Sequence, residues 1–203
     1  MDSLQAFVDD HSRATIGDTA NFYRGYDPAI EIPDGPLIRQ ANLLAYLTSR
    51  RQPQLMLLGE APGYQGARFS GIAFTSERSL PSGQRTSLRP EGWSEPSATI
   101  IHGALALHGL EATTVLWNAC PLHPAKAGLP LSNRTPSENE IAAGLPWLER
   151  LVALLEPGLI VCLGRSAQKL LPGALAIRHP ANGGATLCRA GLADLVAQGL
   201  VRP

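Results

Sequence analysis

The sequence lacks a surplus of charge, a cysteine pair and a long apolar run. Its 17 lysines and arginines balance 17 aspartates and glutamates, so the composition carries no strong basic signature of a nucleic-acid-binding protein. The three cysteines, Cys120, Cys162 and Cys188, are far apart and form no C-x-x-C pair, which argues against a zinc or iron–sulfur site and favours reduced thiols. No apolar run approaches the ~20 residues that a membrane helix needs.

The N-terminal sequence, MDSLQAFVDDHSR, carries acidic residues where a secretory signal would carry basic ones. We therefore expect an intracellular, cytoplasmic protein that does not associate with membranes, and we expect a monomer. Charge is unevenly distributed: residues 1–60 contain 5 Lys/Arg against 8 Asp/Glu, and the remainder contains 12 against 9. This distribution leaves room for a basic face on the second part of the chain.

Aromatic residues make up only 5% of the chain, and most of its 44% hydrophobic content is Ala, Leu, Val and Ile. This composition is typical of strands that helices cover on both faces. Short apolar runs predict buried strands at 54–59, 113–119, 158–164 and 174–179. Helix-like patterns occupy 36–50, 96–108, 137–155, 165–171 and 186–199.

Strands that alternate with helices predict a parallel sheet with right-handed crossovers. We therefore predict an α/β fold, a three-layer α/β/α sandwich with a central four-stranded parallel sheet. The length of 203 residues fits a single domain. Residues 1–35 are acidic and rich in turn residues, and we expect them to form an N-terminal arm whose structure the pattern does not define.

Local signals refine two parts of this prediction. Ser137 and Glu140 form an S-x-x-E capping box, which places a helix start at residue 137. Pro146 lies inside the same predicted helix and should kink it. The region 64–95 is rich in Gly, Ser, Arg and Pro and is too long for a simple connection, so we expect it to be either functional or mobile.

Polar side chains stand where predicted strands end. Glu60 follows the first strand, Asn118 ends the second and His179 ends the fourth. Each alone has an ordinary structural explanation, as a turn residue, a strand-end cap or a loop histidine. Because the carboxyl ends of parallel strands meet at one edge of a sheet, the set predicts a ligand crevice at that edge.

The order of several short motifs resembles that of the uracil-DNA glycosylase superfamily. The resemblance covers roughly residues 54–190 and is nearest to the "GEAPG" branch, the family 4 and 5 type enzymes. It implies the same four-stranded sheet, DNA as the partner, and removal of uracil or a related base with an abasic site left behind. The motifs that carry it are GEAPG (59–63), GIAFTSE (71–77), VLWNACPLHP (115–124), VCLGRSAQKLL (161–171) and RHPANGG (178–184).

The resemblance gives roles to three of these residues. A uracil must leave the base stack before its glycosidic bond is attacked, and Phe74 is the expected stacking platform, although a plain core aromatic is the alternative. The Asn118 amide can match the O4 and N3–H groups of uracil, which cytosine reverses, unless it only bonds the backbone. His179 is expected to donate a hydrogen bond to O2 as charge develops on the leaving base; a solvent-facing loop histidine is the alternative.

Glu60 is the expected carboxylate near the sugar, where it would orient a water molecule and offset positive charge, and Glu77 is its rival. The chain departs here from members with "GQDPYH". They have Asp at the position of Ala61 and Tyr at the position of Gly63, where that Tyr excludes thymine. Gly63 leaves this exclusion to other residues, with Tyr64 as a candidate, or leaves thymine and damaged bases partly admissible. Ala61, Gly63 and Tyr64 are therefore expected among the substrate-binding residues.

The remaining expectations concern DNA and cofactors. The resemblance places Lys126, in the proline-rich segment 121–126, near a phosphate, and Asn182 against the minor groove. The glycine-rich turn that contains Gly183 could hold a phosphate. Basic loop residues expected to neutralise phosphates are Arg68, Arg85, Arg89 and Arg134. Family 4 members ligate an iron–sulfur cluster through four cysteines, which three scattered cysteines cannot supply. We therefore expect no cofactor and no metal; the histidine spacing likewise argues against zinc.

Other functions remain open at this stage. A glycosylase-like protein that grips DNA without turnover is compatible with Ala61 and with the zero net charge. A small-molecule enzyme using the same crevice is another possibility, although no G-x-G-x-x-G or G-x-x-x-x-G-K-[ST] motif supports it. The GRSAQ segment at 164–168 is not a nucleophile elbow, because Gln168 replaces its second glycine.

Overall fold

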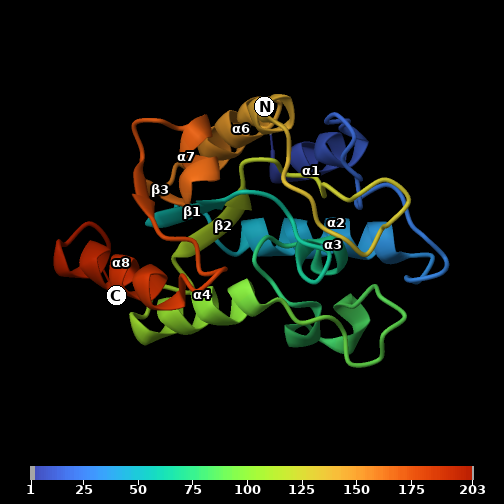
Figure 1. Ribbon diagram of the computed structural model, residues 1–203, viewed down its shortest axis with the longest axis horizontal. Helices are drawn as coiled ribbons and strands as arrows, with labels where there is room; N and C mark the ends of the chain where they lie inside the picture. The colour runs from blue at the N-terminus through green and yellow to red at the C-terminus, as the bar shows by residue number, and fades with distance from the viewer. Residues whose placement is uncertain (1–2, 203) are drawn as a thin grey trace.

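The computed structural model describes residues 3–202 and contains a central four-stranded sheet (Figure 1). All three strand pairs are parallel, in the order β2-β1-β3-β4. This arrangement confirms the predicted α/β fold with a central parallel sheet. The strands are β1 (Leu55–Gly59), β2 (Thr114–Asn118), β3 (Leu159–Leu163) and β4 (Leu175–Ile177).

The strands of the sheet centre are apolar along their whole length because helices cover both faces. Met56 and Leu58 of β1 point into one core cluster, whereas Leu55 and Leu57 point into the other. Every residue of β1 and β2 is buried. The edge strand β4 differs from the prediction of a buried strand, since Leu175 is 48% exposed. All three of its residues are exposed or half-buried, and it pairs only with β3 among the described strands.

The core clusters show which helices form the outer layers. Buried side chains of α1 (Leu4–Arg13), α2 (Gly35–Thr48) and α6 (Leu145–Leu155) pack on one face. Those of α4 (Pro96–Leu107) and α8 (Ala185–Ala197) pack on the other face. Figure 1 shows these helices on opposite sides of the sheet. The three predicted layers are therefore present.

The helix predicted over 137–155 is two helices, so this prediction is wrong in its continuity. The expected capping box is present at the start of α5 (Glu138–Ala142). The chain then breaks, and Gly144 comes so close to the Ala119 carbonyl that a side chain at 144 would overlap it. Pro146 falls in the first turn of α6, where its missing N–H costs nothing. Pro146 therefore begins a helix and does not kink one.

Residues 3–35 contain more order than an arm would have. Helix α1 buries Leu4, Phe7 and Val8 in the core cluster that also contains Met56 and Leu58 of β1. The Asn21 side chain donates hydrogen bonds to three backbone carbonyls of residues 11–14 and so ties the following turn to the helix. The first two residues of the predicted arm lie outside the described residues.

Segment 64–95 is buried in its first part, whereas most of residues 78–91 are exposed. Residues 66–77 are buried almost throughout. The short elements in this part of the fold and after β3 are α3 (Ala67–Ser70), the 3-10 turns η1 (Glu77–Ser79) and η2 (Ser82–Gln84), and α7 (Arg165–Leu170).

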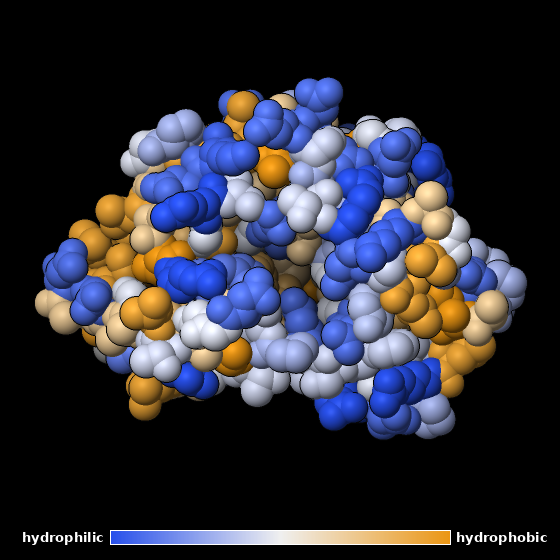
Figure 2. All heavy atoms as spheres, in the orientation of Figure 1, coloured by the Kyte–Doolittle hydropathy of each residue, from blue (hydrophilic) through white to orange (hydrophobic). Residues whose placement is uncertain are grey.

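The surface is mostly hydrophilic in the orientation of Figure 1, and it is hollowed near the middle of that face (Figure 2). Within residues 3–202, helices long and apolar enough to cross a membrane do not occur.

Candidate functional site

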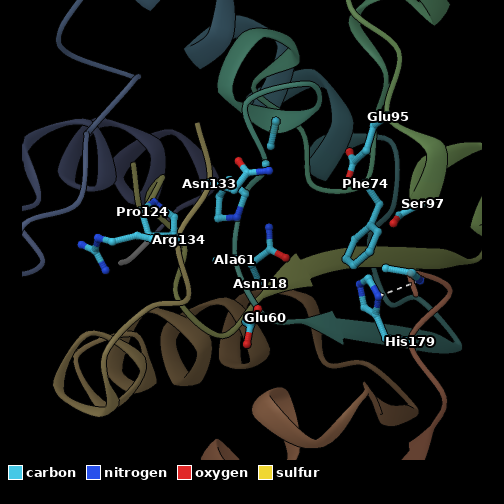
Figure 3. Close-up of a pocket in the computed structure, with 14 residues that line it drawn as sticks. Glu60, Ala61, Phe74, Glu95, Ser97, Asn118, Pro124, Asn133, Arg134 and His179 are labelled. Carbon is cyan, nitrogen blue, oxygen red and sulfur yellow. Dashed lines mark hydrogen bonds between the residues drawn. The ribbon is translucent and has the colours of Figure 1, made fainter. Parts of the chain in front are cut away.

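A cavity of about 210 Å³ lies at the carboxyl ends of the strands (Figure 3). An apolar cavity of about 150 Å³ can bind benzene, so this volume is enough for a small ring. Elements far apart in sequence supply its walls. The lining residues are Glu60, Ala61, Pro62, Gly63, Ala67, Phe74, Glu95, Ser97, Asn118, Pro124, Asn133, Arg134, His179 and Ala181.

Six of the residues predicted to bind the base or act on its bond meet in this cavity, and Arg134, predicted to neutralise a phosphate, also lines it. The six come from the turn after β1, the loop after α3, the end of β2 and the loop after β4. The parallel sheet explains the meeting, because all its strands end at the same edge. The six residues are Glu60, Ala61, Gly63, Phe74, Asn118 and His179.

Phe74 forms one side of the cavity with its ring. The residue is only 5% exposed and has a left-handed backbone with φ of 49°, which is uncommon for a bulky side chain. The His102 ring of α4 lies 3.0 Å, through Nε2, from the Phe74 carbonyl oxygen and holds this turn. The ring thus has a fixed position at the cavity, as a stacking platform requires.

Asn118 ends β2 and is 4% exposed. Its side-chain Oδ1 is buried and has no hydrogen-bond partner within the described residues. A buried amide oxygen without a partner costs ~1–3 kcal/mol, so the stability of the fold does not account for an asparagine at this position. The alternative that Asn118 only caps the strand through Oδ1 therefore fails, and a ligand with an N–H donor would satisfy the oxygen.

Gly59, the last residue of β1, has no side chain and so leaves space for the Phe74 ring and the Asn118 side chain. A Cβ at this position would overlap the Phe74 ring and would lie 2.8 Å from Asn118 Oδ1. Neither neighbour is free to move, since Phe74 is packed in the core and Asn118 is held at the strand end. The first glycine of the GEAPG turn is thus required by the packing of the site.

We expect Gly59→Ala to lower the free energy of unfolding by about 1–3 kcal/mol, the usual cost of overpacking. Chemical denaturation would measure it. Gly103→Ala is the matched control, because Gly103 is an exposed residue within α4 and a Cβ there meets nothing within 4 Å. Alanine in a helix should stabilise by ~0.5–1 kcal/mol. Equal stability of Gly59→Ala and the wild type would contradict the crowding inferred at Gly59.

His179 lies beside Phe74, with ring centroids 5.8 Å apart. The Ala181 N–H donates to His179 Nδ1 at 3.1 Å (Figure 3), so the neutral ring carries its proton on Nε2. Burial lowers the pKa of His179 below its ordinary value, and the nearby Glu60 carboxylate opposes this effect. His179 is therefore a neutral N–H donor at the cavity wall at neutral pH.

The two candidate carboxylates have different places. Glu60 lines the cavity. Glu77 is fully buried outside it and accepts hydrogen bonds from the backbone N–H groups of Thr86, Ser87 and Trp93. Glu77 thus holds the loop of residues 86–93, and of these two candidates only Glu60 lines the cavity.

Tyr64 lies outside the cavity lining, contrary to its expected part in excluding thymine. Its ring packs edge-on against Trp93 at 5.4 Å between centroids, and its N–H donates to the Asn133 Oδ1 at 3.0 Å. Asn133 itself lines the cavity, although no motif of the sequence marks it. On the same wall the buried His123 ring is 2.8 Å, through Nδ1, from the Pro62 carbonyl oxygen, which joins PLHP to the GEAPG turn.

The expected DNA contacts divide into exposed and buried residues. Lys126, Asn182 and Gly183 are exposed, and Asn182 has a left-handed φ of 54°. Arg68 contradicts its prediction, because its side chain is 7% exposed and pairs with the buried Glu31 carboxylate at 2.6 Å. A guanidinium committed to an internal ion pair is not free to bind phosphate.

The other basic loop residues also have partners within the chain. Arg85 donates to the carbonyls of Leu80, Arg78 and Pro90. Arg134 forms two hydrogen bonds with Glu140, and Arg89 pairs with Glu91. Arg178 is a further basic side chain, exposed next to His179, that the motifs did not indicate.

Glu95 is a cavity residue that the sequence analysis missed. It stands at the N-cap of α4 directly before Pro96, where an acid looks like an ordinary helix start. Its side chain does not cap the helix. The Oε2 atom is buried and has no hydrogen-bond partner among residues 3–202, and burial raises the pKa of Glu95 to about 7.

The three cysteines are buried free thiols. Across the described residues, no cluster of three or more His, Cys, Asp or Glu side chains has an arrangement that could hold a metal ion.

Comparisons with known proteins agree with the motif order. A search of curated proteins found no match. The crystal structure of wild-type SMUG2 from Pedobacter heparinus is similar in fold, with a TM-score of 0.62 and 15% identity over 99% of this chain and 100% of that chain. The family model described as the Uracil DNA glycosylase superfamily matches residues 47–196, a span that includes all four strands. This chain therefore belongs to the uracil-DNA glycosylase superfamily.

Proposed function

We propose that this protein is a DNA repair glycosylase that flips out uracil or a related damaged base and hydrolyses its N-glycosidic bond, leaving an abasic site. One observation carries the proposal. An aromatic ring, an amide, a neutral histidine and a carboxylate, from separate parts of the chain, line one small cavity in a member of this superfamily.

Base recognition would depend on Phe74 and Asn118. The flipped base would stack on the Phe74 ring, and the unpaired Asn118 Oδ1 would accept the N3–H of uracil. The Asn118 N–H₂ group would donate to O4. Cytosine has an acceptor at N3 and a donor at its exocyclic amine, so both contacts would be mismatched, at ~1–3 kcal/mol for each buried group left unpaired.

Bond cleavage would depend on His179 and Glu60. As the glycosidic bond lengthens, negative charge grows on the base and positive charge on the sugar. The Nε2–H of His179 would donate to O2 of the departing base. The Glu60 carboxylate would stabilise the sugar cation and orient the attacking water.

Hydrolysis by water also fits the lining of the cavity. A bifunctional glycosylase uses an amine to form a Schiff base with the sugar. Among the residues that the structure describes, the cavity lining contains no lysine. We therefore propose monofunctional chemistry in which water is the nucleophile.

An oligonucleotide cleavage assay tests the proposal. The protein is incubated with a labelled oligonucleotide that contains a single uracil, and abasic sites are then cleaved with alkali. Strand scission by the wild type is the expected result. Asn118→Ala should slow scission by about 10- to 100-fold, since uracil's N3–H and O4 lose their partners. Asn139→Ala is the control. Asn139 lies exposed on α5, so its replacement should leave the scission rate unchanged.

The other outcomes are equally informative. Retarded mobility of the oligonucleotide without scission would replace the enzyme with a glycosylase-like protein that binds DNA without turnover. If the protein neither cleaves nor binds the oligonucleotide, both functions are contradicted.

A further inference from the structure

Glu95 raises a question that the proposed roles of the other cavity residues do not answer. The carboxyl group belongs to the cavity lining, yet within residues 3–202 it neither caps the helix nor forms an ion pair. The Glu95 backbone is satisfied separately, because its N–H donates to Ser76 Oγ at 2.9 Å. The side chain therefore has no structural task among its neighbours that would require an acid.

The packing nevertheless fixes this carboxyl group in place. A Cβ on Gly66 would overlap the Glu95 carboxyl, so the carboxyl group occupies the space that a side chain at 66 would fill. Figure 3 shows Glu95 and His179 on opposite sides of Phe74, with the Glu95 carboxyl directed to the cavity. A ring stacked on Phe74 would have His179 at one edge and Glu95 toward another.

We propose that Glu95 is a base-specificity residue, whose carboxyl group hydrogen-bonds the ring edge away from His179 and selects bases that carry a carbonyl oxygen there. This inference rests on the proposed glycosylase function. If His179 donates to O2, the carbonyl farther from it is O4. An O4 atom has two lone pairs, so it can accept from both Asn118 and Glu95.

The protonation state of Glu95 decides whether it can donate. A neutral carboxyl offers an O–H, whereas a carboxylate only accepts and would repel a carbonyl oxygen. Burial raises the pKa of Glu95 to about 7, so the donor form is present below that pH and is lost as the pH rises through it. The other titratable or charged side chains that line the cavity are Glu60, Arg134 and His179.

Single-turnover excision of uracil from pH 5 to 9 tests the inference. The wild-type rate should fall by about tenfold as the pH rises through the pKa of Glu95. Glu95→Gln keeps a donor that does not titrate, so this fall should disappear. Glu95→Ala should be about tenfold slower than the wild type at pH 6 and should not show the fall.

Two further variants distinguish the position of the Glu95 carboxyl group from the chemical change made in Glu95→Gln. Gly66→Ala leaves Glu95 intact but displaces its carboxyl, and it should reproduce the loss seen with Glu95→Ala. Glu149→Gln, on the exposed face of α6, makes the same chemical change outside the cavity and should retain the wild-type profile. Thermal unfolding of each variant would show that it is folded.

The substrate supplies the last test. 4-Thiouracil keeps N3–H but has a sulfur atom, a weaker acceptor, in place of O4. The penalty of Glu95→Ala should therefore shrink on this base. If Glu95→Ala matches the wild type on uracil, or if Glu95→Gln keeps the fall with pH, the role of Glu95 is wrong while the glycosylase function stands. Absence of excision by the wild type at every pH would overturn both.

Discussion

Replacing His179 with alanine is expected to slow uracil excision by about 100- to 1000-fold, the usual loss for a donor that stabilises developing negative charge. The structure gives the reason. Nδ1 accepts the Ala181 N–H, which leaves Nε2–H as the donor of the neutral ring. Burial lowers the pKa of His179, so the neutral ring persists somewhat below the pH at which a free histidine would become charged.

The loss should be in the chemical step, because the charge on O2 exists only as the bond breaks. Single-turnover rates with saturating enzyme measure that step, and binding to an uncleavable analogue should change little. His108→Ala is the matched control, since His108 caps the end of α4 and does not line the cavity. A His179→Ala rate within threefold of the wild type would contradict the assigned role.

The fold could be predicted because its signals are local. Each strand at the sheet centre is a short apolar run, and a helix-like pattern follows it, so alternation alone gives the parallel sheet. The convergence of Glu60, Asn118 and His179 then follows from the topology, since strand ends of a parallel sheet meet at one edge. Phe74 needed the resemblance, because nothing local distinguishes it from a core aromatic.

The errors arose where the outcome depends on distant partners. Arg68 looks like a basic loop residue, but it pairs with Glu31, 37 positions earlier in the chain. Glu95 looks like a helix start, and only the folded chain shows that its carboxyl faces a cavity. Both residues have side chains whose role is set by tertiary neighbours, which periodicity and capping rules do not describe.

The position of Arg68 leads to a second large effect, on stability. Glu31 is 1% exposed and lies between two buried guanidinium groups, with Arg39 at 2.5 Å and Arg68 at 2.6 Å. Arg39 also donates to the Phe22 carbonyl and to Thr86 Oγ1. This cluster joins α2 to α3, the helix that follows the GEAPG turn, and so supports one wall of the cavity.

Glu31→Ala should lower the free energy of unfolding by about 3–5 kcal/mol, because two buried cations would lose the anion between them. Urea denaturation at pH 7 would measure it. The matched control is Glu91→Ala, which removes the exposed partner of Arg89 and should leave stability nearly unchanged.

The pH dependence of this loss has a definite sign. Burial acts to raise the pKa of Glu31, but Arg68 and Arg39 together hold it below its ordinary value of 4.5. The carboxylate therefore contributes fully above that value, and its contribution is lost as the pH falls through the lower pKa of the folded state. The difference between the wild type and Glu31→Ala should shrink in acid. Two results would contradict this ion-pair cluster: a stability difference between the wild type and Glu31→Ala that stays the same down to pH 3, or a fall in unfolding free energy no larger than that of Glu91→Ala. Arg68 would then be free for another partner, and its assignment to phosphate would have to be reconsidered.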